Sequence, residues 1–139
     1  MGDQRWRQIL ESHDSVSKAI IAEHRGRLIK LTGDGVLATF EGPGRAVRCS
    51  WALRHALEPW GIEIRTGLHT GEVELLGDDI GGIGVHIAAR VLERAGPGEV
   101  LVSAAVPLLV AGSGMEFEDR GEHELKGVPG TWRLFAVMR

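Results

Sequence analysis

The sequence predicts one α/β or α+β domain in which helices pack on a β-sheet. Segments with helical periodicity alternate along the chain with short β-rich runs, which is the element order of such a sandwich. The 139 residues are 43% hydrophobic and 25% charged, the balance of a globular chain. A chain of this length buries about two thirds of its unfolded surface and needs no disulfide or structural metal. We expect one domain over residues 1–139.

The first part of the chain predicts a helix followed by a β-hairpin. Asp3 is the expected cap of a helix of about twenty residues, which ends at residues 24–26. Residues 27–32 and 36–40 are β-rich, and the Gly-Asp-Gly sequence between them predicts a tight reversal with Asp34 at its tip.

The rest of the chain continues the alternation. Pro43 suits the first turn of a second helix, which Pro59 and Gly61 end. The elements expected after it are strands at 62–69 and 72–76, a turn at 78–82, a helix at 83–95, a strand at 100–102, a short helix at 104–110, and two or three antiparallel strands that end at Val137.

Charge and composition exclude several function classes. The net charge is -3, Tyr is absent and aromatic residues total 5%, so a nucleic-acid partner is not expected. The longest apolar stretch, residues 100–111, is shorter than the ~20 residues that span a bilayer. The first ten residues lack the apolar core of a secretory signal. Cys49, the single cysteine, fits a reducing compartment, and we expect a cytoplasmic protein.

Two groups of charged residues are candidates for chemistry. Lys30 and Asp34 lie four residues apart at a strand end and a hairpin tip, where a carboxylate is a good ligand for a hard cation. Asp79 precedes a helix on which His86 and Arg90 share one face. An ordinary turn with a solvated lysine, and a solvated helix face, explain the same residues, so both interpretations stay open at this point.

Four segments together resemble a known family in order and spacing. LIKLTGDGVLATF, IRTGLHTGEVELLGDDIGGIGVHIAARV, GPGEVLVS and HELKGVPGTWRLFAV resemble the catalytic domain of bacterial class III adenylate and guanylate cyclases, over essentially the whole chain. The resemblance implies a ferredoxin-like βαββαβ sandwich and a head-to-tail homodimer with substrate sites at the interface. It also implies conversion of a nucleoside triphosphate to its cyclic monophosphate and pyrophosphate with two Mg²⁺ or Mn²⁺ ions.

The resemblance assigns a role to each charged residue. Asp34 is similar to the second of the family's two metal-binding aspartates. Lys30 and Asp79 are similar to the pair that selects the base. An ammonium donates to adenine N1 and a carboxylate accepts from the exocyclic amine, whereas guanine presents the opposite groups, so this pair implies ATP as the substrate.

Three further residues are implied to contact the sugar and the phosphates. Arg90 is similar to the arginine that neutralises charge on the α-phosphate, for which its planar fork is suited. Lys126 resembles the lysine that reaches the triphosphate. His86 stands where the family commonly has the Asn that orients the ribose, and a histidine does this only if the ring nitrogen facing the ribose carries a hydrogen.

The family domain begins with a strand that carries the first metal aspartate, and here a helix begins near Asp3. We therefore expect unpaired strand edges in the sheet and an incomplete two-metal site, and an adenylate cyclase whose activity is impaired. Two alternatives stay open. The chain is a silent complementing or regulatory partner of a complete cyclase chain, in a heterodimer, or it is an ordinary adenylate cyclase that begins upstream of Met1.

Overall fold

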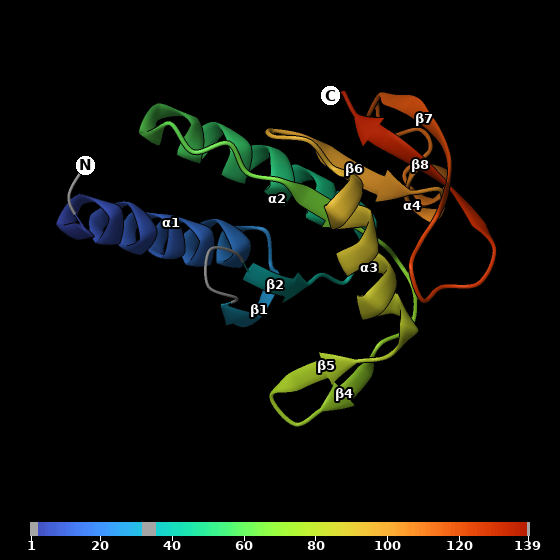
Figure 1. Cartoon of the computed structure of the whole chain (residues 1–139), viewed down its shortest axis with the longest axis horizontal. Coiled ribbons are helices and arrows are strands. Elements are labelled where there is room, and N and C mark those ends of the chain that lie inside the picture. The colour runs from blue at the N-terminus through green and yellow to red at the C-terminus, as the bar shows by residue number, and fades with distance from the viewer. Residues whose placement is uncertain (1–2, 32–35, 139) are drawn as a thin grey trace.

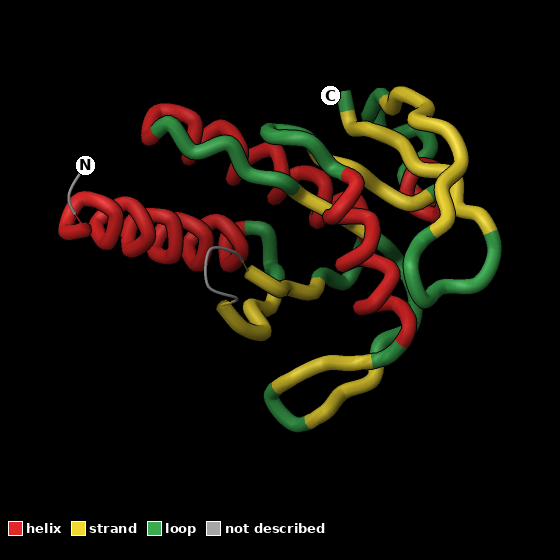
Figure 2. The backbone as a smooth tube through the Cα atoms, viewed as in Figure 1, coloured by secondary structure: helices red, strands yellow, loops and turns green. Residues whose placement is uncertain are grey.

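The computed structural model describes residues 3–31 and 36–138. Helices and strands alternate along this chain as the sequence predicts (Figures 1 and 2). The helices are α1 (Asp3–Glu23), α2 (Pro43–Leu57), the 3-10 helix η1 (Glu58–Trp60), α3 (Ile83–Arg94) and α4 (Ala105–Leu109). The strands are β1 (Arg27–Leu31), β2 (Val36–Thr39), β3 (Thr66–Leu68), β4 (Glu74–Leu76), β5 (Asp79–Gly81), β6 (Val100–Ser103), β7 (Phe117–Glu124) and β8 (Thr131–Val137).

The described strands form three sheets rather than one. Four strands pair in the order β3-β6-β8-β7, with β3 parallel to β6 and the other pairs antiparallel. β1 pairs with β2 as the predicted hairpin, and β4 pairs with β5. β2 and β3 each have one edge without a strand partner among the described residues.

The prediction was wrong in detail between residues 62 and 82. The expected strand over 62–69 is limited to β3, and Asp79 lies in a strand instead of a turn. Leu76 pairs with Asp79, so only Gly77 and Asp78 form the loop, and Gly77 supplies the positive φ of 64° that a two-residue hairpin needs. The β4–β5 hairpin projects from the body of the molecule and is called the arm below (Figure 1).

The core lies on both faces of the four-stranded sheet. Side chains alternate between faces along β6, so Leu101 points to one side and Val100 and Val102 to the other. Leu101 packs with Val91 of α3, whereas Val102 packs with residues of α2 and α4. α3 therefore covers one face of the sheet, and α2 and α4 cover the other.

A smaller core holds the β1–β2 hairpin. Ile21 of α1 packs with Cys49 and Leu53 of α2, and Leu28 of the hairpin packs against them. Because these contacts are between side chains, the hairpin is attached to the helices without hydrogen bonds to the four-stranded sheet. None of the described helices has the length and apolar character that crossing a membrane requires.

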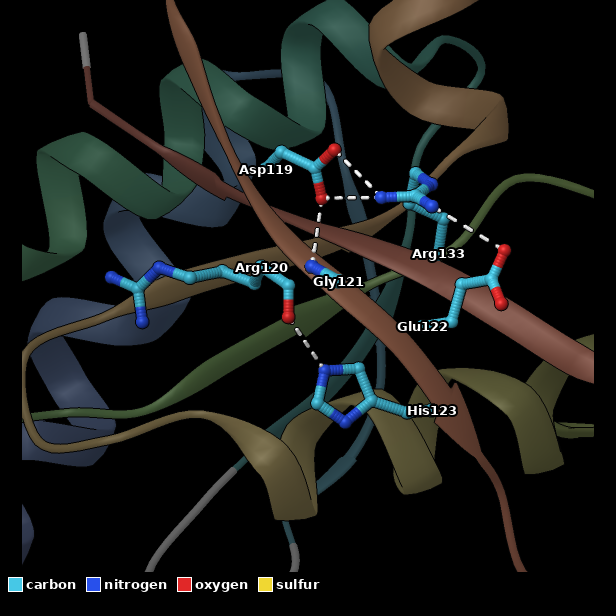
Figure 3. A network of polar contacts seen from close by, with 6 residues as sticks. All are labelled: Asp119, Arg120, Gly121, Glu122, His123 and Arg133. Atoms are coloured by element: carbon cyan, nitrogen blue, oxygen red, sulfur yellow. Dashed lines mark hydrogen bonds and ion pairs between the residues drawn. The ribbon is translucent and has the colours of Figure 1, made fainter.

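The edge strand β7 carries a network of charged groups (Figure 3). Arg133 of β8 donates to both carboxylate oxygens of Asp119 and to Glu122. The register of β7 shifts between Asp119 and Glu122, where Gly121 has a φ of 82°. A bulge and charged side chains both discourage pairing with another strand, so this network protects an exposed edge.

Candidate functional site

The structure brings Lys30 and Asp79 together from positions 49 residues apart. Lys30 Nζ lies 2.9 Å from Asp79 Oδ2, and the two side chains are 50% and 47% exposed. The backbone N–H of Ile80 donates to the other carboxylate oxygen over 2.8 Å. The hydrogen bond from Lys30 and then that from Ile80 lower the pKa of Asp79. The carboxylate is thus held in its charged, accepting form at an accessible place.

A break in the β1 strand accounts for the direction of Lys30. A regular strand would place Lys30 on the same side as Leu28, which packs in the core beneath the hairpin. The pairing with β2 shifts between these two residues, as in a β-bulge. Because a bulge turns the following side chain, Lys30 leaves the core side and meets the arm.

α3 presents a polar stripe of three residues, His86, Arg90 and Arg94, spaced four apart. His86 Nε2 lies 3.0 Å from the carbonyl oxygen of Lys126. Arg94 Nη2 donates to the carbonyl oxygen of Glu124 over 3.0 Å. The stripe therefore contacts the segment between β7 and β8, and the predicted residues His86 and Lys126 lie together.

Arg90 occupies the middle of this stripe. Its Nη1 donates to Glu93 Oε1 over 2.7 Å, and its side chain is 26% exposed. Its Nε is buried and has no hydrogen-bond partner among the described residues. Arg90 is thus a partly covered cation with donor capacity left for a ligand.

An open hollow of about 520 Å³ lies beside the stripe. Arg94 and Lys126 supply positive charge to its lining and Glu124 supplies negative charge, so the cations outnumber the carboxylate. Neither Lys30 nor Asp79 lines it. Their pair lies instead near the beginning of α3, since β5 runs directly into that helix. The lining residues are Arg94, Glu124, Leu125, Lys126, Gly127, Val128, Gly130 and Thr131.

The predicted metal ligand Asp34 lies outside the described residues. Within residues 3–31 and 36–138, no group of three or more His, Cys, Asp or Glu is placed to hold a metal ion. Because Asp34 is not among these residues, the two-ion site that the resemblance implies stays a prediction.

Sequence reasoning missed the pair formed by His69 and Ser103. His69 Nδ1 lies 2.7 Å from Ser103 Oγ, and the ring meets Trp132 edge-on at 5.8 Å between centroids. Burial lowers the pKa of His69. Parallel pairing of β3 with β6 would have predicted this contact. Leu68 pairs with Val102, so His69 and Ser103, the residues that follow them, lie side by side at the end of the two strands.

Comparisons with known proteins find relatives that include a putative adenylate cyclase. No family model matches the chain. The protein named "Putative adenylate cyclase 3" of Rhizobium meliloti (strain 1021) is 35% identical over 133 residues, which are 89% of this chain and 22% of that protein. An uncharacterized protein of Mycobacterium tuberculosis (strain ATCC 25618 / H37Rv) is 36% identical over 121 residues, 83% of this chain and 41% of that one. The chain thus spans less than half of the length of each of these relatives.

Solved structures agree with the fold. The adenylate/guanylate cyclase/hydrolase from Silicibacter pomeroyi has a TM-score of 0.86 and 28% identity, over 99% of this chain and 84% of that one. The adenylyl cyclase CyaB from P. aeruginosa also has a TM-score of 0.86, at 21% identity, over 100% and 85% of the two chains. The chain belongs to the adenylate/guanylate cyclase family of catalytic domains and has their class III fold, as the sequence predicted.

Proposed function

We propose that this chain is an adenylate cyclase domain that recognises ATP through Lys30 and Asp79 and forms 3',5'-cyclic AMP and pyrophosphate. The observation that carries the proposal is the 2.9 Å pairing of these two residues across 49 positions. Nearly half of each side chain is exposed, so both are accessible to a ligand.

The chemistry of the pair favours adenine. Lys30 is only a donor, and the ionised Asp79 is only an acceptor. Adenine offers N1 as an acceptor and its exocyclic amine as a donor. When the base binds, Lys30 and Asp79 give up their hydrogen bond to each other, and each forms one to the base instead. In the same pose guanine places its N1–H against the Lys30 ammonium and its O6 against the Asp79 carboxylate, so neither group finds a partner. A polar group that the bound base covers without a partner discriminates strongly between such similar substrates.

Arg90 and Lys126 are proposed to act on the phosphates. The ribose 3'-oxygen bonds to the α-phosphorus, the bond from that phosphorus to the bridging oxygen breaks, and pyrophosphate leaves with the electron pair. The hydroxyl proton passes to solvent. Arg90 stabilises the charge that develops on the α-phosphate oxygens, and Lys126 the charge on the leaving pyrophosphate. His86 as a ribose ligand stays a prediction of the resemblance.

The arm supports assembly with a second copy of the chain. Its apolar residues Leu75 and Leu76 are 71% and 56% exposed, and Ile83 at the start of α3 is also exposed. Leu75 and Leu76 follow each other in one strand, so an apolar side chain is exposed on each face of the hairpin. Large exposed apolar side chains of this kind are candidates for an interface. We propose that the chain forms a homodimer with its nucleotide sites at the interface, as the resemblance implies.

Metal dependence is proposed from the sequence. Asp34 would hold Mg²⁺ or Mn²⁺, whose chemistry would be to polarise the phosphoryl oxygens. Substituting Asp34→Asn should abolish the metal-dependent turnover of this chain's own half-site, as titration with MnCl₂ and MgCl₂ would show.

The test of the proposed function is nucleotide preference. Wild-type protein and the Lys30→Ala variant are assayed for cyclic AMP and cyclic GMP with Mn²⁺, and Lys18→Ala, an exposed lysine of α1, is the matched control. The ratio of ATP to GTP turnover should fall about tenfold or more in Lys30→Ala only, because a specific donor is lost. An unchanged ratio would refute the assignment of the pair.

A second candidate is that the chain supplies base recognition to a different, complete cyclase chain. It is favoured by the formation of the Lys30–Asp79 pair within a single chain. Mixing this protein with a cyclase whose own base-selecting pair is mutated should then restore cyclic AMP formation. Failure to restore it in a mixture that forms heterodimers would exclude this role.

A further inference from the structure

α3 is fastened to the segment 124–128 at two points, one on each side of Arg90. We propose that His86 and Arg94 are positioning residues that hold this segment, called the Lys126 loop below, so that Lys126 and Arg90 meet the same triphosphate. The proposal rests on the proposed function for the identity of the ligand. The clamp itself rests on geometry alone.

The two contacts are made to backbone carbonyls. His86 Nε2 lies 3.0 Å from the Lys126 oxygen, and Arg94 Nη2 lies 3.0 Å from the Glu124 oxygen. A carbonyl oxygen only accepts, so His86 Nε2 carries the hydrogen and donates it. In the neutral ring the other nitrogen, Nδ1, is then an acceptor and has no hydrogen to give to a ribose oxygen. The contact that the ring makes in this structure is with the loop.

The loop is shaped to receive the imidazole. A Cβ on Gly127 would lie 2.8 Å from His86 Nε2, and Gly127 has a φ of 79°, so glycine is required twice over. The N–H of Val128 donates to the Leu125 oxygen over 2.9 Å and closes the turn. Only a residue without a side chain fits between this turn and α3.

The clamp leaves Lys126 as the exposed part of an anchored turn. Leu125 and Val128 are buried in the same core cluster as Ile87 of α3, so both ends of the turn are fixed by packing. His86 fixes the carbonyl between them. The Lys126 side chain is exposed beside the open hollow. Holding a cation in place before the ligand arrives reduces the entropy lost on binding.

The first experiment measures the loop without nucleotide. Trypsin cleaves after Lys126, at the peptide bond whose carbonyl His86 holds. His86→Asn, whose shorter side chain does not reach this oxygen, should speed this cleavage and the exchange of the Val128 amide about fivefold or more. His86→Gln, with an amide nitrogen near the position of Nε2, should restore slow rates. Arg94→Ala should act like His86→Asn.

Two controls separate a clamp from general loss of structure. His55→Asn alters an exposed histidine of α2, and Arg48→Ala an exposed arginine of the same helix, and neither should change the loop. Exchange of the β6 amides should stay slow in every variant, because that strand is fully buried. Equal cleavage after Lys126 in wild type, His86→Asn and His86→Gln would overturn the clamp.

The second experiment tests the ligand with inorganic tripolyphosphate as the probe, by calorimetry. His86→Asn should weaken its binding about fivefold or more and His86→Gln should restore it, while adenine binding stays unchanged. If the wild-type protein binds no tripolyphosphate, the role of the loop in the proposed function is refuted. Whether His86 and Arg94 hold the loop is then still tested by the rates of cleavage after Lys126. Tripolyphosphate bound equally by all variants would overturn the positioning role.

Discussion

Cys49 lies on the face of α2 that packs against α1 and the β1–β2 hairpin. Its thiol is buried, and burial raises the pKa from 9.0 to about 11. The thiolate is the reactive form, so the native protein should hold this side chain inert at neutral pH.

We therefore predict that iodoacetamide modifies Cys49 only as the protein unfolds. Mass spectrometry in increasing urea should show modification that follows the unfolding curve. Since the folded pKa is raised, the stability that the neutral thiol contributes is lost as pH rises from about 9 to about 11. Fast modification in native buffer would contradict the prediction.

His69 gives the opposite dependence on pH. Burial lowers its pKa below the ordinary 6.5, so the folded state binds the proton less tightly than the unfolded state. The stability contributed by the neutral ring is present above that pH and is lost as pH falls through and below it. The urea concentration at the midpoint of unfolding should decrease as the pH is lowered from about 7.5 to about 5 in the wild-type protein, and it should decrease less in His69→Gln. An equal fall in both would show that other groups are responsible.

At the scale of elements, the contact between β3 and α3 depends on Gly67. A Cβ there would lie 2.4 Å from the backbone nitrogen of Leu92 and 2.8 Å from the carbonyl oxygen of Ala88. Helix and strand backbones approach closely at this point, so a methyl group would push apart α3 and the sheet that it covers.

Gly67→Ala should therefore lower the free energy of unfolding by about 1–3 kcal/mol, the usual cost of overpacking. Gly44→Ala is the control and should not lower the free energy of unfolding, because Gly44 lies inside α2 and a Cβ there would come no closer than 3.6 Å to another heavy atom. Urea denaturation measures both. A stable Gly67→Ala protein would contradict the close approach.

The hairpins and helices differ in how far the sequence predicts them. Pro43 and the apolar spacing indicate α2 correctly, and the alternation predicts the β1–β2 hairpin. The pairing of β3 with β6 was not predicted, because the partners of a parallel strand lie far apart in sequence and leave no local signal. The bulge that turns Lys30 was missed for the same reason, since it depends on the partner strand.

At the scale of the whole molecule, the arm projects away from the four-stranded sheet and its helices (Figure 1). Leu75 is 71% exposed at its outer part, and water contact with such a side chain is unfavourable. Covering it by a second copy would remove this cost.

Leu75→Ser should then weaken dimerisation about tenfold, since a buried leucine contributes roughly 1.5–3 kcal/mol. Light scattering after size exclusion over a range of concentrations would measure it. Leu108→Ser, at the exposed Leu108 of α4, is the control and should dimerise as wild type does. A monomeric wild-type protein, or weaker dimerisation in both variants, would contradict an interface on the arm.

The sequence by itself determined the family, the order of the elements and the residues with chemistry to offer. These follow from local pattern: periodicity, glycine and proline positions, and motifs such as GLHTGEV that need no knowledge of packing. It also determined the donor and acceptor types at Lys30 and Asp79, since these are properties of the side chains.

Only the tertiary structure decided which of these groups meet. The pairing of Lys30 with Asp79 and the clamp of His86 and Arg94 on the Lys126 loop join positions 49, 40 and 30 residues apart. The burial that shifts the pKa values of Cys49 and His69 arises in the same way. Distance through space and exclusion of water exist only once the chain has packed, so they are decided at that level.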